Sequence, residues 1–334
     1  MISTGDPAGL GPEICIKALA EIGATPGFKI VPVGNFETLD EAAALVGYPS
    51  PLAKWTSFDD LQDPGSNSEV LDVEMGENIP RARESAAAGR HTYQILSACT
   101  RLCLEQKAIG MVTCPINKAS LKRAGYERQG HTELLAELAG VTSVETVFSV
   151  ERLKIFFLSR HVSLRDAISL IDRESVLASL LRMDRSMKSL GNPRPRLGVP
   201  GLNPHCGEGG MFGKEEIEAI LPAVEEARRQ GLDVKGPIGA DSIYHLGLEG
   251  RFDAILSLYH DQGHIASKTR DFYRTVTLSL GLPFVRTSVD HGTGFDIAWK
   301  GQANPESLVR AVGLAVEVIQ GSRPDLAPPD SGPR

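Results

Sequence analysis

The feature that most constrains the fold is a regular alternation of strand-like and helix-like segments along nearly the whole chain. Short apolar runs bounded by turn residues alternate with longer segments whose apolar residues recur at helical spacing. We predict strands at residues 28–33, 69–73, 108–113, 145–149, 153–159, 196–199 and 254–258, and helices at 12–22, 36–46, 85–106, 131–139, 174–190, 215–230 and 305–320. This order is typical of an α/β protein with α/β/α layers and largely parallel sheets.

The length of the chain favours two lobes. It has 334 residues, whereas single hydrophobic cores stop growing at about 250–300 residues. We expect a first α/β lobe of residues 1–130 with 305–334, and a second of residues 131–304. Residues 51–65 show no clear period and are expected to form a loop, and the Pro- and Asp-rich tail 324–334 is expected to be disordered.

The charge balance and the cysteines exclude several classes of protein. Lys and Arg number 35 and Asp and Glu number 42, for a formal charge of −7, which argues against a general binder of nucleic-acid backbones. The 5 cysteines are scattered, so a reducing compartment is expected and a disulfide framework is not. Without a signal peptide or an apolar run of about 18 residues, the protein is expected to be cytoplasmic and not to contact membranes.

Three histidines occupy equivalent places in this pattern. His161, His205 and His260 each follow a predicted strand, and ligands of open α/β sheets bind at the carboxyl ends of strands. Three imidazoles there could converge on one divalent cation, Zn²⁺ or else Mg²⁺, Mn²⁺ or Co²⁺. Asp241 could add a carboxylate or orient a ligand. The alternative is that each is a loop histidine bonded to backbone.

Two further places favour an anionic ligand. His131 and Thr132 follow a glycine at a predicted helix start, where free N–H groups and the helix dipole suit a phosphate or carboxylate. Plain capping of the helix is the alternative. Arg286 interrupts an apolar run beside a glycine loop, where a guanidinium could hold a carboxylate bidentately. Residues 5–13 lack the Gly-Lys-Ser/Thr ending of a Walker loop, so we expect a tight strand-to-helix turn there.

A nicotinamide cofactor would need a binding site other than a Rossmann fold. No Gly-x-Gly-x-x-Gly fingerprint follows a strand in a βαβ setting. The loop that contains His291, Gly292 and Thr293 lets the backbone approach a ligand. Asp296 could accept hydrogen bonds from ribose hydroxyls, which favours NAD over NADP. Asn304 would cap the following helix, a role compatible with a backbone contact to adenine.

Five motifs, spread in order over almost the whole chain, carry a specific resemblance. They lie at residues 5–13 (GDPAGLGPE), 130–133 (GHTE), 203–208 (NPHCGE), 259–263 (YHDQG) and 282–293 (LPFVRTSVDHGT). They resemble the motifs of the 4-hydroxythreonine-4-phosphate dehydrogenase (PdxA) family of vitamin B6 (pyridoxine) synthesis. The loop of residues 291–305 also resembles the NAD loop of isopropylmalate and isocitrate dehydrogenases.

The resemblance implies a two-lobed isopropylmalate-dehydrogenase-like fold and a homodimer whose active site is shared between subunits. It implies a divalent metal on His161, His205 and His260. It places the substrate phosphate at His131 and Thr132. Further substrate contacts are implied at Asp241, Lys268, Thr277 and Arg286, and NAD contacts at His291, Gly292, Thr293, Asp296 and Asn304.

Three departures from the family pattern bear on this reading. Only four residues precede Gly5, where the family has a longer first strand. The family's substrate-binding Asn falls on Thr277, which weakens an amide contact. Residues 267–273 differ from the Gly-rich version of the biosynthetic enzyme, whereas His264 and residues 295–299 resemble paralogues that oxidise phosphorylated four-carbon sugar acids.

These features lead to the hypothesis of a metal- and NAD-dependent oxidative decarboxylase. Its substrate would be 4-hydroxy-L-threonine 4-phosphate or 4-phospho-D-threonate/erythronate, oxidised at the 3-hydroxyl. The metal would lower the pKa of that hydroxyl and stabilise the enolate as CO₂ leaves, and Lys268 or Asp241 would be the general base. The alternatives are a dihydrodiol dehydrogenase acting on an aromatic-acid diol, and a non-catalytic protein that binds a metal or a phosphate ester.

Overall fold

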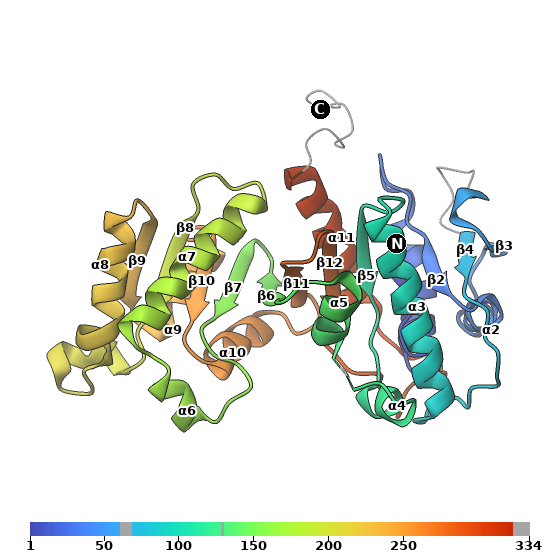
Figure 1. The fold of residues 1–334 in the computed structure, drawn as a ribbon, viewed down its shortest axis with the longest axis horizontal. Coiled ribbons are helices and arrows are strands. Elements are labelled where there is room, and N and C mark those ends of the chain that lie inside the picture. Colours follow the sequence, from blue (N-terminus) through green and yellow to red (C-terminus); the bar gives the residue numbers. More distant parts are fainter. Residues whose placement is uncertain (61–68, 128–129, 323–334) are drawn as a thin grey trace. The chain divides into compact units, whose positions relative to one another are not determined.

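The protein, in a computed structural model that describes residues 1–60, 69–127 and 130–322, consists of two compact units (Figure 1). The first unit comprises residues 1–146 and 276–334, and the second comprises residues 147–275. The tail predicted to be disordered lies outside the described residues, as does part of the loop predicted at residues 51–65. None of the described helices is long and apolar enough to cross a bilayer.

The boundary between the units differs from the one expected from the sequence. Residues 131–146 and 276–304 belong to the first unit, although they were expected in the second lobe. The cause is strand pairing: the strand at Val285–Val289 runs parallel to the strand at Gly110–Thr113, with Thr287 opposite Val112. A strand inside this sheet cannot leave the unit without breaking a hydrogen-bonded ladder.

The first unit is built on a sheet of order β3-β4-β2-β1-β5-β12-β11. Its strands are β1 (Ile2–Ser3), β2 (Pro32–Gly34), β3 (Ala53–Trp55), β4 (Glu69–Asp72), β5 (Gly110–Thr113), β11 (Val276–Leu280) and β12 (Val285–Val289). Its helices are α1 (Gly11–Ile22), α2 (Phe36–Val46), α3 (Ala86–Leu104), α4 (Lys118–Arg123), α5 (His131–Ala139) and α11 (Glu306–Ser322). All neighbouring pairs are parallel except β11 and β12, which are antiparallel.

Alternation along β12 shows which face of this sheet α11 covers. The Arg286 guanidinium bonds the Thr113 hydroxyl on one face, while the next residue, Thr287, donates to the Ala311 carbonyl of α11 at 2.7 Å. Successive side chains of a strand point to opposite faces. Helix α11 therefore lies on the face opposite to the Arg286 side chain.

The second unit is built on a sheet of order β6-β7-β10-β8-β9. Its strands are β6 (Glu145–Val150), β7 (Leu153–Phe157), β8 (Arg196–Pro200), β9 (Asp233–Ile238) and β10 (Ala254–Ser257), and its helices are α6 (Leu164–Ser169), α7 (Arg173–Ser189), α8 (Leu221–Arg229), α9 (Ala240–Leu248) and α10 (His260–Arg270). β6 and β7 are antiparallel neighbours, which confirms the predicted adjacent pair, and the other pairs are parallel. The predicted α/β class with largely parallel strands is confirmed.

Several elements were not predicted, because they lack the pattern that would reveal them. The loop expected at residues 51–65 contains the short edge strand β3 and a 3-10 turn at Phe58–Asp60. Strand β9 contains Gly236 and Pro237, which ordinarily argue against a strand. Helix α10 carries mostly polar residues, so it shows no apolar stripe of helical period.

The glycine-rich segment 5–13 forms the predicted strand-to-helix turn. A side chain at Gly5 would come within 2.3 Å of the Pro115 carbonyl oxygen, and Gly5 has φ +70°, a conformation that favours glycine. The Asp6 carboxylate is fully buried and accepts a hydrogen bond from the Ala8 amide at 2.8 Å. Burial raises the pKa of Asp6 to about 6. This carboxylate therefore stabilises the turn itself.

The close contact between α3 and α4 predicts the effect of one substitution. A Cβ at Gly89 would lie 2.1 Å from the Ser120 carbonyl oxygen, so Gly89→Ala must push the two helices apart. We expect a loss of about 1–3 kcal/mol in the free energy of unfolding, as for other overpacked sites, despite the better helix propensity of Ala. Gly76→Ala, where a Cβ would meet nothing within 4 Å, is the control. Urea unfolding curves that coincide for G89A and G76A would contradict this.

Candidate functional site

A buried arginine without a carboxylate partner marks the first unit. Arg286 of β12 is 3% exposed, and the structure gives it only hydroxyl partners among the described residues. Its Nη2 donates to Thr113 Oγ1 at 2.6 Å and its Nη1 donates to Ser279 Oγ at 2.9 Å. These two hydroxyls hold the guanidinium in place, but they do not neutralise its charge.

Burial of the Arg286 guanidinium lowers the stability of the fold unless an anion pairs with it. Burial lowers the pKa of Arg286, yet a guanidinium remains charged in proteins because its intrinsic pKa is so high. A buried charge that lacks a counter-charge costs several kcal/mol. The cost is recovered when a phosphate or carboxylate pairs with the guanidinium bidentately.

The imidazole of His131 lies beside this charge. His131 is the first residue of α5, and its buried Nε2 has no hydrogen-bond partner in the described structure. Burial, and then the positive charge of Arg286, lower the pKa of His131 well below its usual range. The ring is therefore neutral in the free protein, and an anion bound here would favour its protonation. Both residues were predicted as substrate contacts, and in this structure Arg286 lies near enough to His131 for its charge to act on the ring.

Two other predicted substrate residues lie in the same unit. Thr132, next along α5, has its hydroxyl 3.5 Å from that of Thr146, a distance longer than a normal hydrogen bond between hydroxyls. Thr277 of β11 is buried, and its hydroxyl donates to the Ser288 carbonyl on β12 at 3.3 Å. Thr277 thus serves the β11–β12 ladder in this structure.

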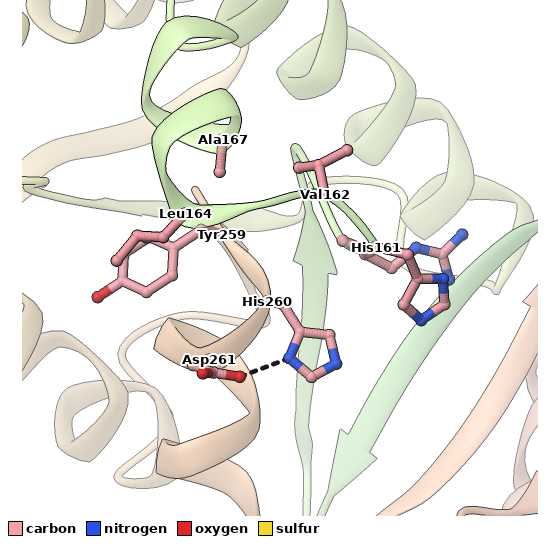
Figure 2. A pocket seen from close by; sticks show the side chains of 8 residues that line it. His161, Val162, Leu164, Ala167, Tyr259, His260 and Asp261 are labelled. Atoms are coloured by element: carbon pink, nitrogen blue, oxygen red, sulfur yellow. Dashed lines mark hydrogen bonds and ion pairs between the residues drawn. The ribbon is translucent and has the colours of Figure 1, made fainter.

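The second unit brings together two of the three predicted metal-binding histidines. His161 follows β7 and His260 begins α10, directly after β10, the parallel neighbour of β7. Their ring centroids are 5.9 Å apart, and both line a cavity of about 280 Å³ that also contains Tyr259 and Asp261. Figure 2 shows the two imidazoles on the neighbouring segments that form this cavity.

The His260 ring is held from two sides. Its Nδ1 lies 2.6 Å from Asp261 Oδ1, the contact drawn as a dashed line in Figure 2. On its face, the His264 ring stacks at 3.7 Å with an interplanar angle of 12°, and His264 Nδ1 lies 2.8 Å from the His260 carbonyl oxygen. A carboxylate on Nδ1 leaves Nε2 as the ligand nitrogen, an arrangement common around metal-binding histidines.

His205 lies on a strained loop that follows β8. Residues 205–209 all have left-handed backbone angles, with φ between 43° and 79°, and only two of the five are glycine. For other residues this conformation costs roughly 1–2 kcal/mol each. The buried Glu216 holds the start of the loop, since its carboxylate accepts from the amides of Leu202 and Asn203 at 2.7 Å. Strain retained in this way is typical of functional segments.

The donor set partly fits a divalent metal. Two imidazoles that bind one tetrahedral Zn²⁺ at about 2.0–2.1 Å place their ring centres roughly 5 Å apart, somewhat closer than the 5.9 Å between His161 and His260. Among the residues that the structure describes, however, no group of three His, Cys, Asp or Glu side chains is arranged to hold a metal. The nearest ring recorded to His205 is that of Phe212, at 6.5 Å between centroids. Two of the three histidines predicted as metal ligands, His161 and His260, therefore lie close together, and His205 is not grouped with them.

The two candidates for the general base also lie in the second unit. Asp241, in the first turn of α9, is exposed, and its carboxylate accepts from the Ser242 hydroxyl at 3.2 Å. It lies close enough to the His205 loop for its charge to contribute, after burial and Glu216, to raising the pKa of Cys206. Lys268 lies on α10, with its Nζ 5.6 Å from the centre of the Phe272 ring.

The predicted nicotinamide loop lies entirely in the first unit. A Cβ at Gly292 would meet nothing within 4 Å, so neither packing nor a positive φ explains this glycine, and a ligand could approach the backbone there. The Asp296 side chain is exposed and has no recorded partner within the described part of the chain. Asn304 accepts a hydrogen bond from the Glu306 amide at 2.8 Å, which confirms its predicted capping role. These features fit a nucleotide whose ribose meets Asp296.

Sequence reasoning missed the residues that support these groups. Thr113 and Ser279 hold Arg286, but their role depends on the pairing of β5, β12 and β11, which no local pattern reveals. Asp261 and His264 hold His260, and the sequence does contain a signal for this. Both follow it in the HDQGH segment, at spacings of one and four residues. In a helix that begins at His260, residue i+4 lies on the same face.

Comparisons with known proteins agree with this picture. The family model described as "Pyridoxal phosphate biosynthetic protein PdxA" matches residues 28–315. An inferred D-threonate 4-phosphate dehydrogenase from Clostridium botulinum (strain Langeland) is 40% identical over 319 residues, which cover 95% of each chain. The crystal structure of 4-hydroxythreonine-4-phosphate dehydrogenase from Klebsiella pneumoniae has a TM-score of 0.84 and 38% identity, covering 96% of this chain and 98% of that one.

A second solved structure is more distant. The terephthalate 1,2-cis-dihydrodiol dehydrogenase from Burkholderia xenovorans LB400 has a TM-score of 0.63 and 29% identity, covering 95% of this chain and 96% of that one. Fold and relatives together define an α/β protein of a dehydrogenase class. The chain belongs to the PdxA family.

The uncompensated charge of Arg286 predicts a selective response to anions. Inorganic phosphate should raise the Tm of the wild-type protein, by an amount equivalent to about 2.7 kcal/mol at 100 times its Kd. Arg286→Met should abolish that response, and should leave the free protein at least as stable as the wild type because a buried unpaired charge is removed. Arg310→Met, which breaks an ion pair with Glu317 in the same unit, is the control and should retain the phosphate response. An undiminished response in R286M would refute the assignment.

Proposed function

We propose that the protein is an NAD- and divalent-metal-dependent dehydrogenase that oxidises the 3-hydroxyl of a 4-phosphorylated four-carbon hydroxy acid, with subsequent decarboxylation. The observation that carries the proposal is the buried Arg286 guanidinium, which lacks a carboxylate partner within the described residues and lies beside the unpartnered Nε2 of His131. Such a site is built for a compact anion. The names of the relatives point to a phosphate ester on the substrate.

Arg286, His131 and Thr132 would bind the phosphate. Anion binding there fixes one end of a short substrate, so binding energy remote from the reacting carbon holds that carbon in position. His131 would gain a proton as the anion binds, because the anion stabilises the imidazolium that burial and Arg286 disfavour. Because the site is buried, water is excluded from the charge pair, which strengthens it.

His161 and His260 would hold the divalent cation, with Asp261 fixing the ring orientation of His260. When bound, the cation supplies a Lewis acid that lowers the pKa of the substrate hydroxyl, and NAD supplies the hydride acceptor. Asp296 would accept from the ribose of the nucleotide, while the open backbone at Gly292 lets it approach. Lys268 or Asp241 would take the hydroxyl proton and later return one to the product.

Among the candidate substrates, the sugar acids are favoured over the amino acid. The family position that supplies a substrate-binding amide is Thr277 here, and its hydroxyl already donates to the Ser288 carbonyl. The relatives at about 40% identity carry the D-threonate 4-phosphate name. We therefore propose 4-phospho-D-threonate or 4-phospho-D-erythronate before 4-hydroxy-L-threonine 4-phosphate.

We also propose a homodimer with a shared active site. Large exposed hydrophobic side chains are concentrated in the second unit, where they include Leu164, Met211 and Ile265 at 58%, 75% and 65% exposure. Exposed apolar surface of this kind commonly marks an interface. An active site shared between subunits would also explain why the described residues of one chain form no group of three metal-ligand side chains.

A second candidate function is favoured by the similarity to the terephthalate dihydrodiol dehydrogenase. In that case Arg286 and His131 would bind the carboxylate of an aromatic diol acid. The two functions differ in whether turnover requires a phosphate ester, which one assay can measure.

The assay is NAD reduction, followed by absorbance with Mg²⁺, Mn²⁺, Co²⁺ or Zn²⁺ present. We expect 4-phospho-D-threonate or 4-phospho-D-erythronate to be oxidised with a kcat/KM at least 100-fold above that of the unphosphorylated acid. The unphosphorylated acid has no phosphate to pair with Arg286. Efficient turnover of an unphosphorylated aromatic diol would support the second candidate. A flat trace with every substrate and metal would favour a non-catalytic binding protein.

The metal role is tested separately from turnover. His260→Ala should lower the affinity for Co²⁺ by at least 10-fold in calorimetry and should abolish activity, since loss of a ligand removes a direct bond. His245→Ala, which removes an exposed histidine paired with Glu249 in the same unit, is the matched control. Full activity of the wild-type enzyme after chelation and dialysis would disprove the metal requirement.

A further inference from the structure

Glu13 and Lys17 on α1 form a buried polar contact with a distant segment. The Glu13 side chain is fully buried. Its Oε1 accepts from Lys17 Nζ at 2.9 Å and from the Ala303 amide at 2.8 Å. A buried carboxylate is costly unless charges and hydrogen bonds compensate it, and here Lys17 and the Ala303 amide provide both.

Lys17 completes the contact from the same helix, one turn further on. Its Nζ donates to the carbonyl oxygens of Gly301 at 2.9 Å and Ala303 at 2.7 Å, in addition to Glu13. An ammonium has three donors, and all three are used. The backbone of residues 301–303 is thus bound through one amide and two carbonyls.

The other end of the same loop is also fixed by the start of α1. The Leu10 amide donates to the Thr293 carbonyl at 2.9 Å. A Cβ at Gly9 would lie 2.8 Å from Thr293 Cβ, and one at Gly294 would lie 2.4 Å from Leu10 Cδ1. Residues 9–17 therefore hold the segment 293–303 at both ends.

The segment between these contacts carries the groups assigned to the nucleotide. Asp296 lies within it, and Asn304 follows it directly. Groups that bind a ligand must be held to within about 0.5 Å of their productive positions. A mobile loop must become ordered when the nucleotide binds, and the entropy lost in this ordering lowers the affinity. All three donors of Lys17 are used, and Glu13 Oε2, which has no recorded partner among the described residues, is buried.

We propose that Glu13 and Lys17 are positioning residues that set the affinity for the nucleotide by holding residues 301–303 in place. The inference rests on the proposed function, because it takes NAD as the ligand of this loop. It predicts an effect on nucleotide affinity that a purely structural ion pair would not have. The control for a structural role is the Lys29–Glu69 pair, which is about as buried, at 19% and 7% side-chain exposure against 21% and 0% for Lys17 and Glu13.

Steady-state kinetics on the full-length metal-loaded enzyme tests the proposal. Lys17→Met should raise the KM for NAD about 10-fold, which corresponds to about 1.4 kcal/mol, and change kcat and the KM of the phosphorylated substrate less than twofold. Glu13→Gln should act in the same direction. Lys17→Arg, which keeps a cation able to donate to several carbonyls, should restore the KM for NAD to within about threefold of wild type. Lys29→Met should leave it unchanged.

Hydrogen exchange on the free protein gives a readout that needs no activity. Peptides that cover residues 295–304 should exchange at least 10-fold faster in K17M than in the wild type or in K29M. The Gly301 and Ala303 carbonyls lose their donor, and Glu13, the acceptor of the Ala303 amide, loses the lysine that holds it. Direct titration of NAD into the wild type separates two failures. If the wild type binds NAD and K17M binds it equally well, the inference is wrong and the proposed function stands. If the wild type binds no NAD, the proposed function fails, and the inference with it.

Discussion

The candidate site depends on a charge that the protein buries but does not neutralise. Arg286 is surrounded by hydroxyls from β5 and β11 and by the imidazole of His131, and no carboxylate is recorded against it in the described part of the chain. Natural proteins rarely leave a buried guanidinium in this state, because folding then costs energy that an ion pair would recover. The strand order around β12 is what makes it possible: β12 lies between β5 and β11, so hydroxyls from both neighbours reach the guanidinium. Stability is lost at one point in the sheet, and a bound anion would restore it.

The second unit also contains a feature that lowers the stability of the fold, but of a different kind. The His205 loop runs through consecutive left-handed residues, and the buried Glu216 carboxylate holds its first amides. In the first unit the cost is electrostatic, and in the second it is conformational. Both are placed next to residues that the family resemblance assigns to ligands, as expected when a site must be shaped before its ligand arrives.

The sequence predicted the largely parallel α/β class of the fold and the proximity of two histidines, for identifiable reasons. His161 and His260 come together because they follow β7 and β10, which are parallel neighbours, so the strand-end rule sufficed. His205 follows β8, another neighbour of β10, yet the rule fixes only where a loop begins. The left-handed path of that loop depends on Glu216, which is distant in sequence. Helix α10 escaped prediction because it is mostly polar, and β11 because its apolar alternation is short, although β11 supplies the hydroxyl that orients Arg286.

The alternation of side chains along β12 has an evolutionary consequence. Arg286 projects toward the proposed anion site, while its neighbour Thr287 bonds α11 on the opposite face of the sheet. A shift of β12 by one residue would move each of its side chains to the other face of the sheet. The Arg286 guanidinium would then lie under α11, and the Thr287 side chain would lie on the face of the proposed anion site. During evolution, substitutions along β12 can therefore be tolerated one at a time. Insertions and deletions between the turn after β11 and Arg286 should not be tolerated.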